Sequence, residues 1–313
     1  QPLFTGEIIC YQMDLYQAER LREELGERGL TASVVTLPDL WDLPEPLQGL
    51  VYAIPQGGER MLKLDMLEQA FHVLRPHGRL VVFSPYEKDE LIPAALKKIF
   101  GRVHTPGNAV FWAQRDGERR RRRHEVTFQV SRGELSSLRF LSRPGVFSYG
   151  RFDDGARALV ETTEVNPGEE ILDIGCGCGT NGVCVGMRAG PDAHVAFLDS
   201  NVRAIALAEH NARANGLTSF ETVATSRVDG VPEGNFDVVL ANPPYYAQLN
   251  IARLFIERAA VLLRPGGRLS LVTKQPDQVG PIMADHFGMT EVAERRGYTI
   301  LCTRRPDASR IRE

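Results

Sequence analysis

One eight-residue pattern occurs twice in this chain of 313 residues. It reads VLRPHGRL at residues 73–80 and LLRPGGRL at residues 262–269, and each copy leads into an apolar run. A second pair of similar segments lies upstream in the same order, VYAIPQ at 51–56 and VLANPP at 239–244. Because two matches recur in one order at nearly the same offset, we predict a duplicated α/β domain.

Short apolar runs alternate with helical patterns in both halves of the chain. In the second half the predicted strands are 171–174, 194–198, 236–241 and 269–273, and the helices include 202–214 and 251–263. In the first half the predicted strands are 8–11, 33–36, 49–54 and 80–84, with helices near 15–28 and 60–74. This alternation is typical of βαβ units in a doubly wound, mostly parallel sheet. We therefore predict two tandem Rossmann-like α/β domains. The first is degenerate because it lacks an opening strand with a glycine-rich turn.

The predicted domain boundaries follow from a charge-dense segment between the halves. Residues 1–115 form the degenerate domain, 116–124 an arginine-rich linker, and 125–313 the second domain, which opens with a β-hairpin turning near 131–133. The linker contains Arg119, Arg120, Arg121, Arg122 and Arg123. A run of like charges is usually a solvated linker, and contact with nucleic-acid phosphates is the alternative reading.

The composition limits the classes of partner. A net charge of −3 excludes a uniformly basic nucleic-acid-binding protein, so such binding would need a local patch. No apolar run approaches the roughly 20 residues of a membrane span, so no membrane partner is expected. Five cysteines are few and odd in number, which favours the cytoplasm. Cys176, Cys178 and Cys184 lack the CxxC spacing of a metal site, and no metal is predicted. The oligomeric state is left open.

A glycine-rich turn follows the first predicted strand of the second half, in the segment EILDIGCGCG at 170–179. Gly175, Gly177 and Gly179 stand at alternate positions, which lets the backbone approach a ligand closely. Asp173 precedes the turn and can accept a hydrogen bond from an ammonium group. The segment therefore predicts a cofactor site.

The end of the next predicted strand separates two kinds of cofactor. Asp199 lies there, where a carboxylate suits ribose hydroxyls, and its neighbour Ser200 is a further candidate ligand. The NAD-binding fingerprint needs a third glycine at the position that Thr180 occupies. We therefore favour S-adenosylmethionine over NAD, with a turn that binds nothing as the remaining alternative.

Asn242, Pro243, Pro244 and Tyr245 follow the strand predicted at 236–241. Ligands of open α/β sheets bind beyond the carboxyl ends of the strands, so this tetrad is expected to face the glycine turn. Two prolines stiffen the chain, and the Asn242 side chain and the Pro243 carbonyl can both accept hydrogen bonds from a planar amine. Tyr245 offers a ring on which a base can stack. We predict that Asn242, Pro243 and Tyr245 are catalytic residues and that Asn242 also binds the cofactor. The alternative is a plain Pro-Pro turn.

The first half carries the architecture without this chemistry. Ile54 stands where Asn242 stands in the second half, and Gln56 stands in place of Pro244. An isoleucine side chain cannot accept a hydrogen bond. The N-terminal domain is therefore predicted to be inactive.

With these residues in view, the whole chain resembles the bacterial ribosomal RNA guanine-N2 methyltransferases, the small-subunit enzyme and its large-subunit sibling. The most specific match is RPGVFS at 143–148, followed by DDGA at 153–156. Asp173, Asp199 and the tetrad at 242–245 also fall on the family pattern, although the family tetrad commonly ends in Phe rather than Tyr.

The resemblance implies a class I S-adenosylmethionine-dependent methyltransferase that modifies the exocyclic N2 of a guanine in ribosomal RNA, free or in a ribosomal subunit. It also implies that Phe147 helps to close the cofactor pocket. The residues themselves restrict the acceptor only to a planar amine, so adenine N6 and a protein glutamine side chain stay open as alternatives. An RNA-binding assembly factor with a vestigial fold is the non-enzymatic alternative.

Overall fold

The computed structural model describes residues 6–43, 46–107, 109–132, 135–244 and 249–307. The chain divides into two compact units. The large unit consists of Gln1–Thr36, Val126–Ser142 and Val146–Glu313, and the small unit of Leu37–Glu125 and Arg143–Gly145. This division differs from the boundaries expected at 115 and 124, because the first 36 residues group with the C-terminal part of the chain.

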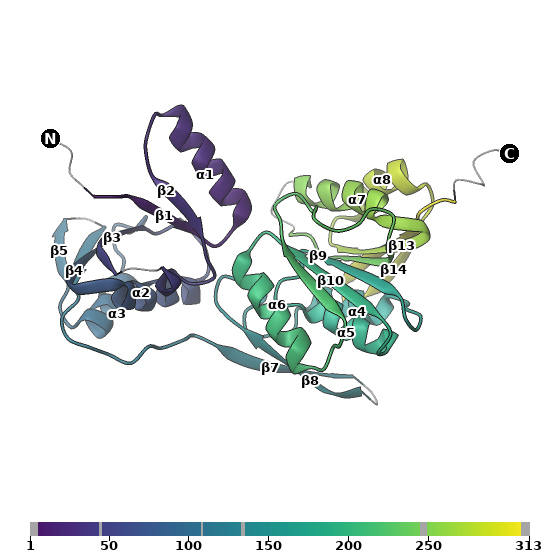
Figure 1. Cartoon of the computed structure of the whole chain (residues 1–313), viewed down its shortest axis with the longest axis horizontal. Helices are drawn as coiled ribbons and strands as arrows, with labels where there is room; N and C mark the ends of the chain where they lie inside the picture. Colours follow the sequence, from purple (N-terminus) through teal and green to yellow (C-terminus); the bar gives the residue numbers. More distant parts are fainter. Residues whose placement is uncertain (1–5, 44–45, 108, 133–134, 245–248, 308–313) are drawn as a thin grey trace. The chain divides into compact units, whose positions relative to one another are not determined.

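The large unit is built on a seven-stranded sheet with the order β11-β10-β9-β12-β13-β15-β14 (Figure 1). Its strands are β9 (Glu170–Ile174), β10 (His194–Asp199), β11 (Phe220–Ala224), β12 (Phe236–Ala241), β13 (Leu263–Thr273), β14 (Thr290–Arg295) and β15 (Tyr298–Arg304). All neighbouring pairs from β11 to β13 are parallel, whereas β15 is antiparallel to both β13 and β14. The sheet is therefore mostly parallel, as predicted.

Helices cover both faces of this sheet. They are α4 (Asp154–Thr162), α5 (Thr180–Ala189), α6 (Val202–Ala214), α7 (Asn250–Leu262) and α8 (Pro276–Phe287). One core cluster joins residues of α4, α5 and α6 to Ile171 of β9, and the other joins residues of α7 and α8 to Leu172 and Ile174. Because successive strand residues point to opposite faces, the alternation along β9 places the two clusters on opposite sides of the sheet. The doubly wound α/β fold predicted for this half is confirmed.

Two further pieces belong to the large unit. The predicted hairpin is present as β7 (Val126–Arg132) and β8 (Leu135–Ser142), which pair antiparallel. At the N-terminus, β1 (Ile9–Gln12), α1 (Leu15–Glu27) and β2 (Ser33–Thr36) form a βαβ unit with parallel strands. The structure thus places residues from both ends of the chain in one unit.

The small unit has a four-stranded sheet with the order β3-β4-β6-β5. Its elements are a short 3-10 helix (Leu40–Asp42), β3 (Leu47–Ala53), α2 (Arg60–Val73), β4 (Leu74–Phe83), α3 (Leu91–Phe100), β5 (His104–Gly107) and β6 (Val110–Gln114). β3 is parallel to β4, and β6 is antiparallel to both β4 and β5. The succession β12–α7–β13–α8–β14–β15 in the large unit has the same order and strand directions. The duplication predicted from the sequence is therefore a duplication of structure.

The repeated Arg-Pro-x-Gly segment lies inside the strands β4 and β13, which begin earlier than predicted. Each strand shifts register against its partner at this segment. Arg115 and Arg305, at equivalent places after β6 and β15, donate side-chain hydrogen bonds to the carbonyls of Leu74 and Leu263. These contacts hold an irregular strand segment where the sequence alone indicates a turn.

The glycine that both copies of the repeat share is required by close backbone packing. A Cβ on Gly267 would lie 2.8 Å from the carbonyl oxygen of Phe236, and a Cβ on Gly78 would lie 2.9 Å from the carbonyl oxygen of Arg75. Real Cβ atoms do not approach backbone oxygens so closely, so each strand irregularity depends on a residue without a side chain. The glycine that recurs in the repeated eight-residue pattern therefore has a steric cause.

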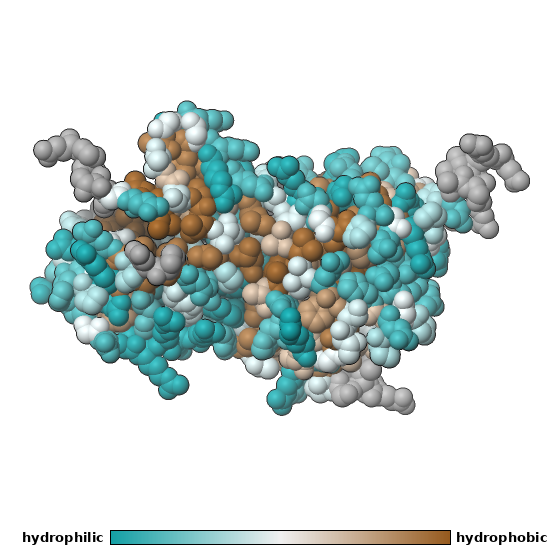
Figure 2. All heavy atoms as spheres, viewed as in Figure 1, coloured by the Kyte–Doolittle hydropathy of each residue, from teal (hydrophilic) through white to brown (hydrophobic). Residues whose placement is uncertain are grey.

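The strands of the first half belong to two different sheets rather than to one. In the described residues, β1 and β2 form a two-stranded sheet of their own, apart from β3 and β4. In the large-unit sheet, β9 pairs with both β10 and β12 and so joins the two parts. In the part of the first half that the structure describes, no strand pairs with both neighbours in the way that β9 does. Figure 2 shows hydrophobic residues around the β1–β2 pair, where Ile8 and Leu30 are exposed.

Among the described residues, no helix is both long and apolar enough to span a membrane.

Candidate active site

The carboxyl ends of β9, β10 and β12 lie next to one another in the large-unit sheet. Asp173 of β9 is paired with Phe197 of β10 on one side and with Leu240 of β12 on the other. The chain leaves these strands at Gly175, Ser200 and Asn242, respectively. Strand register therefore brings the glycine turn, the acidic strand end and the start of the Asn-Pro-Pro segment to one edge of the sheet, as predicted.

The glycine turn has left-handed backbone conformations at Gly175, Gly177 and Gly179, with φ of 68°, 55° and 81°. The amides of Gly175 and Cys176 both donate to the carbonyl of Leu198, at 2.8 and 3.0 Å. Gly179 precedes α5, and a Cβ there would lie 3.0 Å from the Cα of Ala208. The turn is thus fixed to the end of β10, and glycine is needed both for its φ angles and for packing against α6.

Asp173 is completely buried beside this turn. Its Oδ2 accepts a hydrogen bond from the amide of Gly182 at 2.8 Å, and its Oδ1 has no hydrogen-bond partner in the described part of the chain. Burial raises the pKa of this carboxyl to about 7; the Gly182 bond lowers it in part, and the charge of Asp199 raises it further. An unsatisfied, buried carboxylate oxygen is costly unless a ligand supplies a donor.

Asp199 ends β10 and holds the glycine turn through its side chain. Its Oδ2 accepts from the amide of Gly177 at 2.9 Å, and its Oδ1 accepts from the amide of Asn201 at 2.8 Å. Burial raises the pKa of Asp199 to about 6, while the bonds from Asn201 and Gly177 lower it and the nearby charge of Asp14 raises it. The carboxylate therefore links two loops at the edge of the sheet.

Ser200 is not a simple ligand candidate, because its hydroxyl donates to Oδ2 of Asp14 at 2.5 Å. Asp14 precedes α1, and its Oδ1 caps that helix by accepting from the amide of Gln17 at 2.9 Å. Sequence reasoning missed Asp14 at this site. The spacing of Asp14 and Gln17 indicates a helix start, but no local pattern indicates that the helix lies against Ser200.

Asn242 and Pro243 directly follow β12, all of whose residues are buried, and Pro243 is buried while Asn242 is partly exposed. Tyr245, the predicted stacking residue, lies outside the described residues. Val146 packs against Cys178, Ala204 and Leu207. By contrast, the side chain of Phe147, which was expected to close the cofactor pocket, is 57% exposed.

The residues at this edge fit an S-adenosylmethionine-type ligand on three grounds. Oδ1 of Asp173 and Oδ1 of Asn181, in the first turn of α5, are buried and have no described partner, so both can accept from a ligand. A Cβ on Gly175 would meet the ring of Phe255 at 3.0 Å, so the turn has no room for larger side chains. Asp199 supplies a carboxylate at the neighbouring strand end. Asn181 was not predicted, although its place just after the glycine turn could have indicated it.

The five linker arginines belong to the small unit and do not behave alike. Arg119 is half-buried: its guanidinium contacts Glu68 at 3.0 Å and donates to the carbonyls of Lys98 and Ile99. Arg120, Arg121, Arg122 and Arg123 are exposed. Arg121 and Arg123 lie over the ring of Trp41, at 5.5 and 5.7 Å from its centroid. Arg119 therefore stabilises the small unit. Arg123 forms an ion pair with Glu125 at 3.4 Å, and the side chains of Arg120, Arg121 and Arg122 are exposed.

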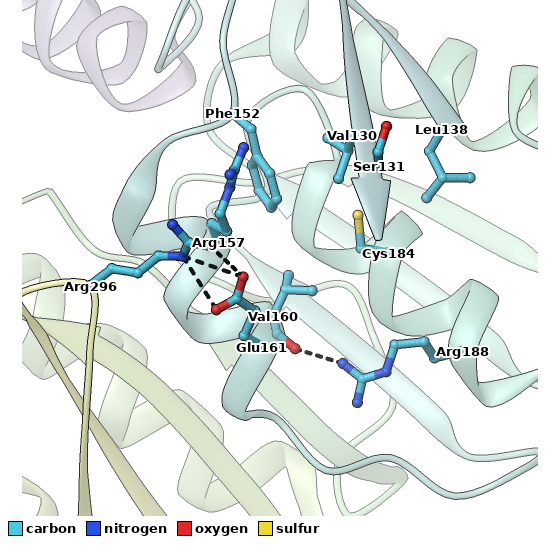
Figure 3. A pocket seen from close by; sticks show the side chains of 10 residues that line it. All are labelled: Val130, Ser131, Leu138, Phe152, Arg157, Val160, Glu161, Cys184, Arg188 and Arg296. Carbon is cyan, nitrogen blue, oxygen red and sulfur yellow. Dashed lines mark hydrogen bonds and ion pairs between the residues drawn. The ribbon is translucent and has the colours of Figure 1, made fainter. Parts of the chain in front are cut away.

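A separate hollow in the large unit does not overlap with the site. It has a volume of about 90 Å³ and is lined by residues of β7, β8, α4 and α5 together with Phe152 and Arg296. Figure 3 shows Glu161 facing Arg296 in this hollow, and Arg188 donating to the carbonyl of Val160. None of its lining residues is a predicted site residue. Within the described residues, no group of three or more His, Cys, Asp or Glu side chains could hold a metal ion.

Comparison with known proteins assigns the family. The family described as the methyltransferase small domain matches residues 137–302. A protein of Pseudomonas paraeruginosa named ribosomal RNA small subunit methyltransferase C is 30% identical over 285 residues, which is 88% of this chain and 80% of that protein. The chain belongs to this family of methyltransferases. A relative of the same name from Chromohalobacter salexigens is 35% identical over 179 residues, covering 54% of this chain and 52% of the relative.

A solved structure extends the likeness to nearly the whole fold of this methyltransferase. It is a T. thermophilus 16S rRNA N2 methyltransferase in complex with AdoMet and guanosine, and it covers 97% of this chain and 90% of its own. The TM-score is 0.76 at 21% sequence identity. The predicted tandem Rossmann-like fold and the prediction of an S-adenosylmethionine-dependent methyltransferase are confirmed.

Proposed function

We propose that this methyltransferase transfers a methyl group from S-adenosylmethionine to the exocyclic N2 of a guanine in small-subunit ribosomal RNA. Its relatives are named for methylation of that RNA, and the T. thermophilus protein of similar fold was solved with guanosine. The observation that carries the proposal is the position of Asn242 and Pro243, at the end of β12 and in register with the glycine turn on β9. Because the proposed substrate is ribosomal RNA, we also propose that the protein is located in the cytoplasm.

Asn242 and Pro243 each offer one carbonyl oxygen to a planar amine. An exocyclic amine of a base has its lone pair delocalised into the ring, which makes the nitrogen a poor nucleophile. Two acceptors that hold its hydrogens favour a pyramidal nitrogen and stabilise the positive charge that develops on it. Holding the base in this orientation supplies much of the remaining acceleration.

The cofactor would supply a methyl group bound to a positively charged sulfur. The lone pair of the amine nitrogen would form the new N–C bond, and the electron pair of the broken C–S bond would return to sulfur. One amine proton would then be released. In this arrangement Asp173 would accept from the ammonium group of the cofactor, and Asp199 from its ribose hydroxyls. A paired guanine cannot present its amine to such a site, so the target nucleotide must be unstacked.

The small unit would contribute RNA binding without catalysis. At the end of β3, Ile54 is buried and stands in the place of Asn242, so this strand end offers no side-chain acceptor. The exposed arginines at 120–123 offer phosphate contacts. Arg122 also lines, with Lys98, a groove of about 210 Å³ between α2 and α3 that has apolar walls. We propose that residues 1–115 are the degenerate copy of the sequence duplication and residues 125–313 the catalytic copy, with the linker between them, although residues 1–36 group with the large unit in the structure.

Replacement of the strand-end asparagine tests the proposal. Asn242→Ala should lower turnover by about two to three orders of magnitude with little change in cofactor affinity, because the lost contact matters most in the transition state. Asn235→Ala is the matched control, since Asn235 is an exposed residue just before the amino end of the same strand. Methyl transfer by Asn242→Ala at the rate of the parent protein would contradict the assignment.

A further inference from the structure

Residues at the start of α1 contact the two loops that follow β10 and β11. On the β10 side, the amide of Leu15 donates to the carbonyl of Ser200 at 2.8 Å, and the amide of Val202 donates to the carbonyl of Met13 at 2.8 Å. With the bond from the Ser200 hydroxyl to Asp14, three hydrogen bonds join this short segment to the turn that follows Asp199. The turn is therefore fixed from outside the sheet.

A second contact between α1 and a loop of the sheet lies one helical turn further along the helix. Glu19 accepts from the hydroxyl of Ser226 with both carboxylate oxygens, at 3.0 and 2.9 Å. Ser226 belongs to the loop after β11, and the amide of its neighbour Thr225 donates to the carbonyl of Asp199 at 3.0 Å. Asp14 and Glu19 thus each hold one of the two loops that flank Asp199.

These two loops lie at the carboxyl edge of the sheet, beside the carboxylate that suits ribose hydroxyls. Ligands of open α/β sheets bind in this crevice, and an adenosine would extend from the ribose toward the loops after β10 and β11. Residues 1–36 belong to the same compact unit as this sheet. The N-terminal segment is therefore placed to complete the cofactor site, although its sequence belongs to the degenerate half.

We propose that residues 13–19 form the outer wall of the adenosine end of the cofactor pocket, with Asp14 as a positioning residue that holds Ser200 and thereby orients Asp199. This inference rests on the proposed use of S-adenosylmethionine. Asp14 does not touch the reacting atoms. It acts on cofactor affinity through the turn at 199–201, in which the Asp199 side chain accepts from the amides of Gly177 and Asn201.

Two substitutions of Asp14 separate its hydrogen bond from its charge. Asp14→Ala removes the acceptor for Ser200, and we expect binding of S-adenosylmethionine and S-adenosylhomocysteine to weaken about tenfold alike, because both contain adenosine. Asp14→Asn keeps an acceptor for the amide of Gln17, and its NH2 can donate to the Ser200 hydroxyl. The contact with Ser200 is thus kept without the charge, so this variant should bind like the parent at pH 8. Glu23→Ala, on the exposed side of the same helix, is the matched control. Calorimetry with the full chain gives the affinities.

The pH profile provides a readout that a merely stabilising role would not change. The ionisable groups that interact with Asp199 are Asp14 from the α1 side, Asp173 from β9 and Cys176 from the glycine turn. Asp14→Asn removes one neighbouring negative charge, so its cofactor affinity should persist to lower pH than that of the parent protein. The part of the acid limb near pH 6, where Asp199 titrates, is the part that should move. If this part stays at the parental pH in Asp14→Asn, the proposal is overturned.

The remaining outcomes are equally clear. If Asp14→Ala lowers the unfolding temperature but leaves cofactor affinity unchanged, α1 only stabilises the fold and the inference is wrong. Cofactor binding by the parent with unchanged binding by Asp14→Ala therefore overturns this inference alone. Absence of cofactor binding by the parent would overturn the proposed function and the inference together.

Discussion

Two carboxyl groups, those of the fully buried Asp173 and the partly buried Asp199, stand at the ends of neighbouring strands, and both have a raised pKa. The pKa of Asp173 is about 7 and that of Asp199 about 6, in each case chiefly because burial disfavours the charged form. Each carboxylate also accepts a backbone hydrogen bond from the glycine-turn region, and these bonds limit the increase. Their protonation should therefore depend on whether a cationic ligand is bound.

The sign of the pH effect follows from proton uptake. In the ligand-free protein these carboxyls bind protons more tightly than in the unfolded chain, whose aspartates titrate near 3.8. Their contribution to stability is thus fully present below about pH 4 and is lost as the pH rises through about 6 and 7. A positively charged cofactor has the opposite preference, because it binds best to the ionised carboxylate of Asp173.

Cofactor binding should accordingly weaken as the pH falls below about 7. We expect the affinity to fall by up to about tenfold per pH unit, with release of a proton on binding. Calorimetry in buffers of different ionisation enthalpy measures both quantities. Asp173→Asn is the control and should remove the part of the dependence near pH 7. Affinity that stays constant from pH 5.5 to 8 would show that Asp173 does not meet a cationic group.

At the scale of elements, α6 holds the β7–β8 hairpin through two asparagines one helical turn apart. Asn211 is fully buried; it accepts from the amide of Leu141 and donates to the carbonyls of Leu141 and Cys178, at 2.8, 2.9 and 2.8 Å. Asn215 exchanges the same kind of bonds with Arg139, at 2.9 and 2.7 Å, but is only half-buried. The two side chains thus satisfy alternate residues of β8.

This pair provides an internal comparison of burial. Asn211→Ala should lower the free energy of unfolding by about 2–4 kcal/mol, because it removes three hydrogen bonds to backbone groups, of which the carbonyl of Cys178 is buried and those of Leu141 are partly buried. Asn215→Ala should cost less than about 1 kcal/mol, since water can replace its bonds. Urea denaturation of both variants measures the difference. Equal losses would contradict the assignment of Asn211 as the main tether of the hairpin.

Local patterns predicted most of the large-unit sheet and the place of its site residues. These patterns are the alternation of strands and helices, the glycine turn and the Asn-Pro-Pro segment. Each depends only on residues that are close together in the sequence. The position of α1 could not be read in this way, because Asp14 and Ser200 are 186 residues apart in the sequence. The early start of β4 and β13 was likewise missed, since it depends on the side chains of Arg115 and Arg305.

At the scale of the whole molecule, the two halves share a repeated arrangement of strands and helices but differ in the residues at their strand ends. Both retain the β–α–β–α arrangement and its glycine-dependent strand irregularity, but the described residues of the first half contain no counterpart of β9. Without that strand there is no glycine turn, and Ile54 replaces the strand-end asparagine. The first βαβ unit instead contacts the loops beside Asp199. We therefore propose that catalysis belongs to the large-unit sheet and that the first βαβ unit supports its cofactor site.

The identity of the methylated atom tests this account most directly. The full chain is incubated with labelled S-adenosylmethionine and unmodified small-subunit ribosomal RNA, free or in subunits, and the RNA is digested to nucleosides. Asn242→Ala serves as the control for background transfer. The account predicts label in N2-methylguanosine with the parent protein and little label with the variant. Label in N6-methyladenosine, or in protein alone, would contradict it.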